Sequence, residues 1–273
     1  MQRTVVFVLS ANYSGSTWLS LLLGSHSQAF YVGELNKMFH DDPVPCRLCE
    51  ERGVPCPVFQ DADRIKAKNI HNTVLQRTGA KVLVDNSKTL SWSRKFLAEE
   101  RFQRKYIHLI RDPRAIAFSL QLREKPINLD KWVKKNREIR EFLETNHLDY
   151  QQVLYNELAE NMDAELERLC EWLELTYEPA QKAYWNFEHH GPGRNGATAG
   201  FLQQYVASDA NFYEQNKQRN FHDLRWKTHL SEENRQVIRE HAGLQAFLQD
   251  FGLKFDDNGL QRRAARSEMA AAD

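Results

Sequence analysis

The chain has 273 residues, of which 41% are hydrophobic, and its 37 basic side chains balance its 37 acidic ones. This length suffices for one α/β domain with a large core and at most an appended lobe. The balanced charge excludes a broadly basic nucleic-acid-binding protein, so any anion site must be local. Apolar stretches near the N-terminus are too short for a secretory signal or a membrane span, and we expect a cytoplasmic protein without a membrane partner.

Strands and helices are expected to alternate along the chain. Strands are predicted at Thr4–Leu9, Lys81–Asp85, Lys105–Ile110 and Tyr150–Tyr155. Helices are predicted at Ser16–Leu23, Asp61–Arg77, through Trp92 and Phe96, from Pro113 onward, at Leu129–Asn146, Asn156–Leu173 and Ser231–Gln249. This alternation predicts an α/β fold, a three-layer sandwich with a central, mainly parallel sheet, right-handed crossovers and helical cap segments.

The domain organisation is expected to be simple. We predict one domain over residues 1–255, with a Cys- and Pro-rich insertion or lid at residues 40–60. Residues 256–273 end in a polar, Ala-rich stretch and are expected to form a flexible tail.

A turn rich in Ser, Asn and Gly, Ser10–Thr17, joins the first strand to the first helix. Backbone N–H groups that converge at a helix N-terminus, with Ser and Thr hydroxyls, suit a phosphate group, although an ordinary turn has the same composition. An ATP-binding P-loop requires G-x-x-x-x-G-K-[ST], but here Ser10 replaces the first Gly and Ser16 replaces the Lys. A P-loop kinase or NTPase, in which Asp85 would be a magnesium ligand, is therefore kept only as an alternative function.

Two motifs carry a resemblance to a known family. Tyr13–Leu19 (YSGSTWL) resembles the 5'-phosphosulfate loop of sulfotransferases that use 3'-phosphoadenosine 5'-phosphosulfate (PAPS), which usually begins with Lys or Arg. Tyr106–Arg123 is similar to that family's 3'-phosphate element, a strand, Arg-Asp-Pro-Arg and a helix with a Ser. The resemblance implies a P-loop-like fold, PAPS as the co-substrate, and nucleotide contacts from Tyr13, Ser14, Gly15, Ser16, Thr17, Trp18, Arg111, Ser119, Arg123, Tyr155 and Arg194.

The 3'-phosphate element is also plausible from its residues. Arg111 follows a strand, and Ser119 and Arg123 are four residues apart on one helix face, which suits a dianionic phosphate. The alternative is that Arg111 and Arg114 form ion pairs at the surface. Arg194 belongs to a Gly-rich loop, which the resemblance implies closes over the nucleotide and which is otherwise a flexible solvated loop.

The resemblance also implies catalytic residues. Gly33-Glu34 is similar to the Gly-Glu-Glu of protein-tyrosine sulfotransferases, which makes Glu34 the candidate general base, although it is alternatively an exposed loop carboxylate. Asp85–Lys88 resembles the family's Asp-x-Ser-Lys, and Lys88 is expected to stabilise the leaving group because Tyr13 replaces the usual cation. The loss of that cation also allows a catalytically inactive nucleotide-binding module. His26, His40 and His108 are rival bases, and we expect His26 and His108 to be structural.

The expected acceptor is a hydroxyl or an amine of a small molecule, and sulfuryl transfer from an organic donor requires no metal. Cys46, Cys49 and Cys56 nevertheless offer three thiolates at the spacing of half a zinc site. His40 is the nearest candidate for a fourth ligand. The alternatives are reduced thiols in a lid or a redox-labile pair.

Overall fold

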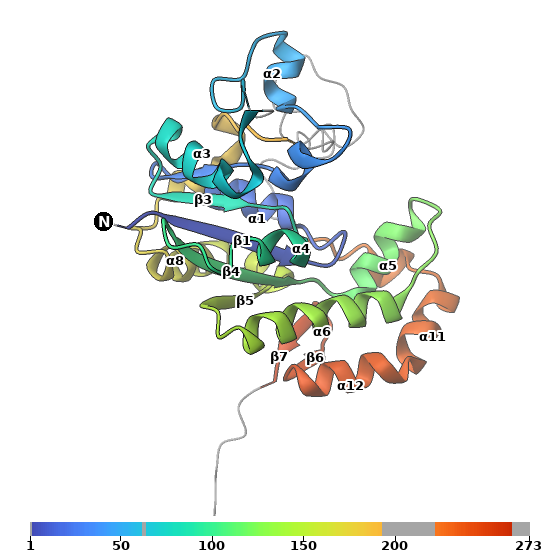
Figure 1. Cartoon of the computed structure of the whole chain (residues 1–273). Coiled ribbons are helices and arrows are strands. Elements are labelled where there is room, and N and C mark those ends of the chain that lie inside the picture. Colours follow the sequence, from blue (N-terminus) through green and yellow to red (C-terminus); the bar gives the residue numbers. More distant parts are fainter. Residues whose placement is uncertain (1, 62–63, 193–221, 264–273) are drawn as a thin grey trace, which may run out of the picture.

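A computed structural model of the chain describes residues 2–61, 64–192 and 222–263 (Figure 1). Its centre is a parallel sheet with the strand order β2-β3-β1-β4-β5, and a separate antiparallel pair, β6-β7, follows near the end of the described chain. The strands are β1 (Thr4–Ser10), β2 (Ala29–Tyr31), β3 (Val82–Asp85), β4 (Gln103–Ile110), β5 (Tyr150–Leu154), β6 (Leu253–Phe255) and β7 (Leu260–Arg262).

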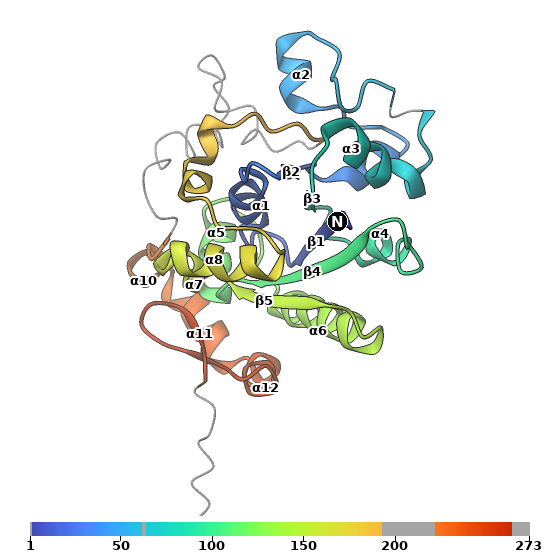
Figure 2. The ribbon, with the colours of Figure 1, turned by 90° about the vertical axis from the view of Figure 1, so that its left-hand side faces the viewer.

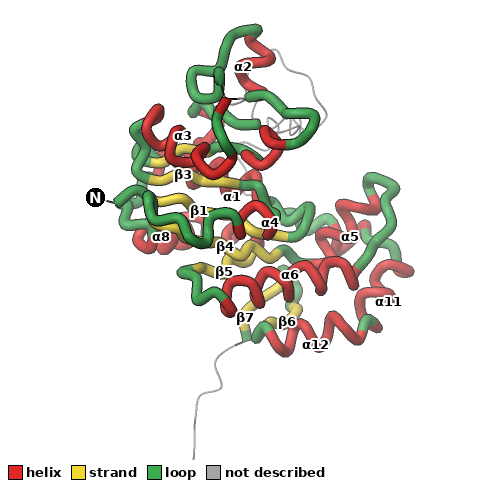
Figure 3. Tube along the Cα trace, in the orientation of Figure 1, coloured by secondary structure: helices red, strands yellow, loops and turns green. Residues whose placement is uncertain are grey.

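Helices connect and cover these strands (Figure 3). The α-helices are α1 (Ser16–Gly24), α2 (Arg47–Arg52), α3 (Ile70–Thr78), α4 (Leu90–Arg94), α5 (Pro113–Gln121), α6 (Leu129–Thr145), α7 (Tyr155–Glu160), α8 (Met162–Trp172), α10 (Trp226–His229), α11 (Glu232–Glu240) and α12 (Ala242–Asp250). The 3₁₀ helices are η1 (Leu35–Phe39), η3 (Ala67–Asn69) and η4 (Pro179–Asn186).

The side chains of β1 alternate between two apolar layers. Val5, Phe7 and Leu9 pack with residues of α3, α4 and α6, whereas Val6 and Val8 pack with α1, α8 and η4. Figure 2 shows α1 and α8 on one side of the sheet and α3, α4 and α6 on the other. Every residue of β1 is buried, as expected for a central strand of a parallel sheet covered on both faces. The predicted three-layer α/β sandwich is confirmed.

Local sequence explains where several helices begin. Asp112 caps α5 by accepting a hydrogen bond from the N–H of Arg114, and Pro113 occupies the first turn, where a missing N–H costs little. The Ser231 hydroxyl caps α11 by accepting from the N–H of Asn234. Both starts were predicted from these residue types.

Some predicted boundaries are wrong for physical reasons. The helix expected at Asp61–Arg77 begins only at Ile70, because its fully buried apolar side chains, Ile70, Val74 and Leu75, lie in that part. The helix expected from Asn156 begins one residue earlier and is interrupted at Asn161, and the last helix is interrupted at His241.

Three short strands were not predicted: β2, β6 and β7, each of three residues. The β6-β7 pair carries the folded structure past residue 255 as far as Arg263. The insertion at residues 40–60 contains α2, which lies at the top of Figure 1. Within the described ranges, none of the helices has the length and apolar character needed to span a bilayer.

Candidate active site

The described parallel strands end along one edge of the sheet, and several of the predicted site residues follow these ends. Glu34 follows β2, Asn86–Lys88 follow β3, residues 11–15 follow β1, Arg111 follows β4 and Tyr155 follows β5. In open α/β sheets this edge is where ligands bind. The strand order puts the loop after β1 in the middle, with Glu34 and Lys88 on one side and Arg111 and Tyr155 on the other.

The loop after β1 has an unusual backbone. Tyr13 and Gly15 both have left-handed conformations, with φ of 64° and 81°. A Cβ built on Gly15 would lie 2.2 Å from Cε2 of Tyr155, so only glycine fits both the conformation and the space. Trp18 is buried in the next turn, with its ring centroid 5.4 Å from that of Tyr155.

The Ser14 hydroxyl is buried and, within the described part of the chain, no group forms a hydrogen bond with it. It lies two residues before α1, beside Ser16 and Thr17 at the helix N-terminus. A buried polar group without a partner is unfavourable unless a ligand or water satisfies it. The loop therefore has the chemistry of an anion-binding site, as the sequence predicts.

Arg111 connects the loop to the far side of the edge. Its Nη1 donates to the carbonyl of Tyr13 at 2.9 Å, and its guanidinium lies 4.5 Å from the centroid of the Tyr155 ring. Its buried Nε has no hydrogen-bond partner among the described residues. Arg111 is thus buried, which contradicts the alternative prediction of an ion pair at the surface.

An acidic side chain faces Arg111. The Asp223 carboxylate lies 3.8 Å from Nη2 of Arg111, in a small cavity that Tyr155 also lines. Burial raises the pKa of Asp223, but Arg225 and Arg111 lower it by more, so the carboxylate remains charged. Asp223 therefore offsets part of the positive charge that Arg111 offers to an anion.

A second group of cations surrounds Tyr13. The Arg123 guanidinium lies 5.4 Å from the centroid of the Tyr13 ring, and Nζ of Lys125 donates to the Tyr13 hydroxyl at 3.1 Å. Nη1 of Arg123 also donates to the carbonyl of Ser119 at 2.8 Å, so these two residues are brought together, although the Ser119 hydroxyl donates within α5 to Ala115. Lys125 was not predicted, and its position two residues after Arg123 was the available signal.

On the other side of the loop, Glu34 lies between two lysines. Nζ of Lys88 donates to Oε1 of Glu34 at 2.6 Å, and Lys37 pairs with Oε2. Burial raises the pKa of Glu34, but the two lysines outweigh it and hold the pKa below its ordinary value of 4.5. The Glu34 side chain is only 13% exposed, which contradicts the alternative of an exposed loop carboxylate.

Two features of these lysines were not predicted: the ion pair of Lys37 with Glu34 and the backbone conformation of Lys88. Lys37 was not predicted, although its position three residues after Glu34 was a signal for an ion pair. Lys88 has a φ of 62°, a left-handed conformation that is strained for a residue with a Cβ. Strain of this kind collects at functional sites.

Hydrogen bonds join the three loops of this region. The N–H of Asn86 donates to the carbonyl of Gly33 at 2.9 Å, and the side-chain amide of Asn86 reaches Oγ1 of Thr17 at 3.4 Å. The N–H of Asn36 donates to the Ser87 hydroxyl at 3.1 Å. The position of Glu34 relative to the anion loop is therefore set by direct contacts.

Asp85 has a different role from the one considered in the NTPase alternative. Its Oδ2 accepts hydrogen bonds from Nε2 of His71 at 2.7 Å and from Nε1 of Trp92 at 2.8 Å. Its Oδ1 accepts from the N–H of Ser87 at 2.8 Å. Both oxygens are thus engaged in a buried network, which leaves no carboxylate oxygen free for magnesium.

Of the histidines named as rival bases, His26 and His108 lie away from this sheet edge. Nε2 of His26 is 2.8 Å from the carbonyl of Thr176. His108 is buried against Asn136, and burial lowers its pKa to about 4. Both side chains are buried and hydrogen-bonded within the fold, whereas His40 is exposed and lines a depression next to Lys37.

The cysteine prediction is confirmed in its grouping but wrong in its fourth member. Cys46, Cys49 and Cys56 meet His190, not His40. His190 was missed because it is 134 residues beyond the last of these cysteines, a separation at which spacing carries no signal. Arg194 lies outside the described residues.

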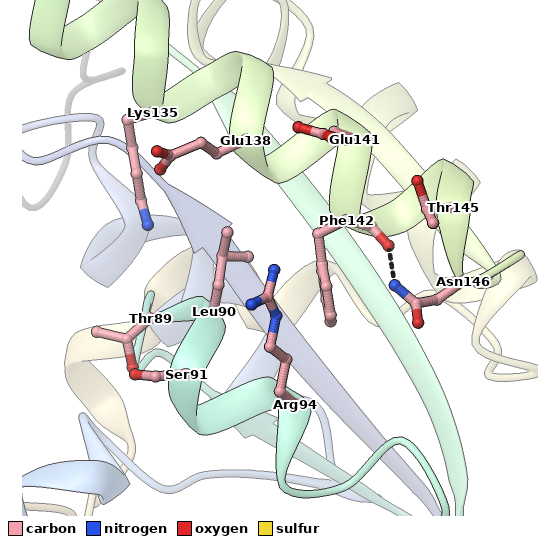
Figure 4. Close-up of a pocket in the computed structure, with 10 residues that line it drawn as sticks. All are labelled: Thr89, Leu90, Ser91, Arg94, Lys135, Glu138, Glu141, Phe142, Thr145 and Asn146. Carbon is pink, nitrogen blue, oxygen red and sulfur yellow. Dashed lines mark hydrogen bonds between the residues drawn. The ribbon is translucent and has the colours of Figure 1, made fainter.

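A groove between α4 and α6 is separate from this edge. Figure 4 shows Arg94 facing Phe142 and Glu138 across it, and the predicted site residues are not among those that line it. The side-chain amide of Asn146, the residue after α6, donates to the carbonyl of Phe142.

Comparison with known proteins gives the family. The model of the family described as "Sulfotransferase family" matches residues 5–179. No curated protein sequence matches the chain significantly.

A solved sulfotransferase structure has a similar fold. The "Sulfotransferase Domain from the Curacin Biosynthetic Pathway" is 21% identical, with a TM-score of 0.57 over 87% of this chain and 97% of that one. A domain from the Synechococcus PCC 7002 olefin synthase is 19% identical, with a TM-score of 0.47 over 88% and 95% of the two chains. Mouse sulfotransferase SULT7A1 complexed with PAP is 12% identical, with a TM-score of 0.41 over 89% and 90%. The family model matches more than half of the residues of this chain, and the chain therefore belongs to the sulfotransferase family.

Proposed function

We propose that the protein transfers a sulfuryl group from PAPS to a hydroxyl or an amine of a small molecule. The observation that carries this proposal is that two groups suited to anions, the loop at Ser14–Thr17 and the side chain of Arg111, lie on one sheet edge. A donor with a 5'-phosphosulfate and a 3'-phosphate needs two such sites, whereas an ordinary nucleoside triphosphate needs one.

The residues of the edge fit this donor. The Ser14 hydroxyl and Nε of Arg111 are both buried and, among the described residues, lack hydrogen-bond partners that a bound anion would provide. Ser14–Thr17 would hold the phosphosulfate, and Arg111 with Ser119 and Arg123 would hold the 3'-phosphate. Tyr155, which contacts both Gly15 and Arg111, would lie beside the nucleotide.

Glu34 is the proposed general base. PAPS supplies the sulfuryl group on an organic leaving group, so the protein must provide positioning and charge. The acceptor proton passes to Glu34 while the new bond to sulfur forms at the acceptor atom. Because the two lysines weaken Glu34 as a base, it accepts the proton once bond formation has made the acceptor acidic.

Lys88 is the proposed stabiliser of the leaving group. Its ammonium lies on the same side of the loop as Glu34 and offers positive charge to the oxygen released with the nucleotide. The N-terminus of α1 adds partial positive charge. These groups replace the cation that is lost at Tyr13.

The acceptor site is proposed next to Lys37, the second partner of Glu34. A surface depression there is lined by Lys37, Phe39, His40, Asp41, Asp42 and Val44. Two apolar side chains, Phe39 and Val44, lie there among charged and polar ones, which suits a small molecule with hydroxyl or amino groups. The depression adjoins the proposed base through the ion pair of Lys37 with Glu34.

The NTPase alternative is less well supported. The loop lacks the lysine of a P-loop, and both oxygens of Asp85 are engaged within the fold. An inactive nucleotide-binding module shares the two anion sites, so only turnover separates it from an enzyme.

A thermal-shift titration tests the donor. Adenosine 3',5'-bisphosphate without metal should raise Tm, and ATP with Mg²⁺ should raise it much less at the same concentration. No stabilisation by the bisphosphate would refute the proposed donor.

Turnover is tested with PAPS and a panel of hydroxylated and aminated acceptors. Lys88→Ala should abolish transfer while bisphosphate binding stays largely intact. Unchanged turnover in this variant would refute the role of Lys88, and binding without transfer to any acceptor in the unmodified protein would favour the inactive module.

A further inference from the structure

Three cysteines and one histidine from distant parts of the chain converge outside the proposed active site. The Sγ atoms of Cys46, Cys49 and Cys56 lie 3.8, 3.4 and 3.6 Å from Nδ1 of His190. The four potential ligand atoms all lie within 4.8 Å of one another. The three cysteines are buried and none forms a disulfide.

We propose that this cluster is a structural zinc site. Tetrahedral zinc with Zn–S of about 2.3 Å and Zn–N of about 2.0 Å separates a sulfur from a nitrogen ligand by about 3.6 Å. The observed separations fall around this value. Four protein ligands complete a tetrahedral shell, which is typical of structural sites, whereas catalytic zinc retains an open position.

The surroundings of His190 fit this role. With Nδ1 directed at the sulfurs, its Nε2 lies 3.6 Å from Oε2 of Glu188, whose Oε1 accepts a 2.6 Å hydrogen bond from Arg52. A carboxylate behind a histidine ligand is typical of zinc sites, where it helps to orient the ring. The Phe30 ring stacks on His190 at a centroid distance of 6.2 Å.

The cysteine segment connects the cluster to the sheet edge. Cys46 forms an isolated antiparallel bridge with Pro192, two residues after His190. The carbonyl of Pro192 accepts a 2.9 Å hydrogen bond from the N–H of Glu34. A Cβ on Gly33 would lie 2.5 Å from that same carbonyl oxygen, so the two segments are in close contact.

The zinc site therefore stabilises the position of the segment that contains Glu34. The metal holds residues 46–56 against residues 190–192, and these contact Gly33 and Glu34 directly. Any effect of the metal on transfer rests on the proposed function, whereas the existence of the site does not.

Metal analysis of the full chain tests the proposal. Protein purified without chelators should contain about one zinc per chain by inductively coupled plasma mass spectrometry. Cys49→Ser should bind zinc at least about tenfold more weakly in competition with a chromophoric chelator. The matched control is Cys170→Ser, since Cys170 is a buried thiol near Gln181 outside the cluster and its loss should leave the zinc content unchanged.

Cobalt substitution provides a test that needs no variant. The unmodified chain loaded with Co²⁺ should show the intense visible bands and thiolate charge-transfer absorption of a tetrahedral thiolate site. Zinc removal should lower Tm, and zinc should restore it. Bisphosphate binding at Arg111 should persist without zinc, which keeps a failure of the zinc proposal distinguishable from a failure of the proposed donor.

Four results would overturn the proposal. Three of them are unchanged zinc affinity in Cys49→Ser, an octahedral cobalt spectrum, and protein without bound zinc whose cluster thiols react only after reduction. Iron with acid-labile sulfide in place of zinc would equally contradict it.

Discussion

At the scale of single residues, the two lysines beside Glu34 define the charge of the proposed base. Lys88 and Lys37 each contact one carboxylate oxygen, so the group has no need of a proton at neutral pH. Its pKa is lowered from 4.5 despite burial. The same pairing orients both Lys88 and Glu34, because each holds the other.

Glu34→Gln removes the proton acceptor and keeps the shape of the side chain. We expect kcat to fall by about 100-fold or more, because general base catalysis contributes about 10²–10⁴-fold. Bisphosphate affinity should change little. Glu165→Gln, which removes a carboxylate paired with Arg168 away from the site, is the control and should leave kcat unchanged.

The pH profile follows from the lowered pKa of Glu34. The carboxylate stays ionised above its folded-state pKa, so kcat/KM should hold a plateau as the pH falls from neutral and should decline only below 4.5. An acid limb near about 6.5, the ordinary pKa of histidine, would instead point to a histidine base. The ion pairs also stabilise the fold above the ordinary pKa of 4.5, and this contribution is lost as the pH falls further.

Asp223 competes with an anion for Arg111. Removal of its charge in Asp223→Asn should tighten the binding of adenosine 3',5'-bisphosphate by about fivefold, the effect of one unit charge near 4 Å in a watery site. Isothermal titration calorimetry checks this. Weaker binding would mean that Asp223 positions Arg111 and does not compete with the ligand.

At the scale of elements, the turn from β1 into α1 depends on its contact with the start of α7. Gly15→Ala combines a strained backbone with a clash against Tyr155. Gly79→Ala is the matched control, because Gly79 also has a positive φ, 69°, but an added Cβ would meet nothing within 4 Å.

The two glycine variants separate strain from crowding. Gly79→Ala should cost about 1–2 kcal/mol of unfolding free energy. Gly15→Ala should cost about 1–3 kcal/mol more. Urea denaturation measures both, and equal losses would show that Tyr155 yields without cost.

Asp85, at the end of β3, accepts hydrogen bonds from side chains of α3 and α4. Asp85→Ala leaves the donors of His71, Trp92 and Ser87 buried without their acceptor, which should cost about 3 kcal/mol or more. Asp163→Ala is the control. Asp163 also accepts two hydrogen bonds, from Tyr177 and Lys182, but its side chain is 61% exposed, so its loss should cost about 1 kcal/mol or less. Similar losses in urea denaturation would contradict a structural network at Asp85.

At the scale of the whole molecule, the location of the site at one sheet edge could be predicted from the sequence. The individual contacts within that site were harder to predict. Residues that follow predicted parallel strands, such as Arg111 and Tyr155, must share an edge, so their proximity could be predicted. The ion pair of Glu34 with Lys88 could not, because it depends on how the side chains of two separate segments are oriented. His190 could not be predicted as a member of the cysteine cluster either, because its contact with Cys46 is a tertiary one.

The short strands show the same limit. A strand of three residues such as β2 or β7 contains too little alternation to be recognised, and its pairing partner decides its conformation. Long elements such as α6, with a clear apolar face, were predicted within one residue at their ends. Motif chemistry and long periodic segments were therefore predictable, and contacts between distant segments were not.

The two arginines of the Arg-Asp-Pro-Arg motif serve different parts of the molecule. Arg114 joins the start of α5 to the C-terminal segment, since Nη2 donates to the carbonyls of Asp256 and Gly259 at 3.0 and 3.1 Å. Its guanidinium also lies 4.0 Å from the centroid of the Trp226 ring. Arg111 faces the anion loop instead.

Conservative replacement of Arg114 should therefore mainly lower stability, whereas replacement of Arg111 should mainly lower nucleotide affinity. Arg114→Lys loses the planar fork and the stacked contact, which should lower the unfolding free energy by about 1–3 kcal/mol with little change in bisphosphate affinity. Arg111→Lys should weaken that affinity about tenfold or more, with a smaller loss of stability. Urea denaturation and calorimetric titration of both variants check the pair. If both variants lost affinity equally, the C-terminal segment that Arg114 holds would have to contribute to the nucleotide site, because Arg114 itself is directed toward that segment and Trp226.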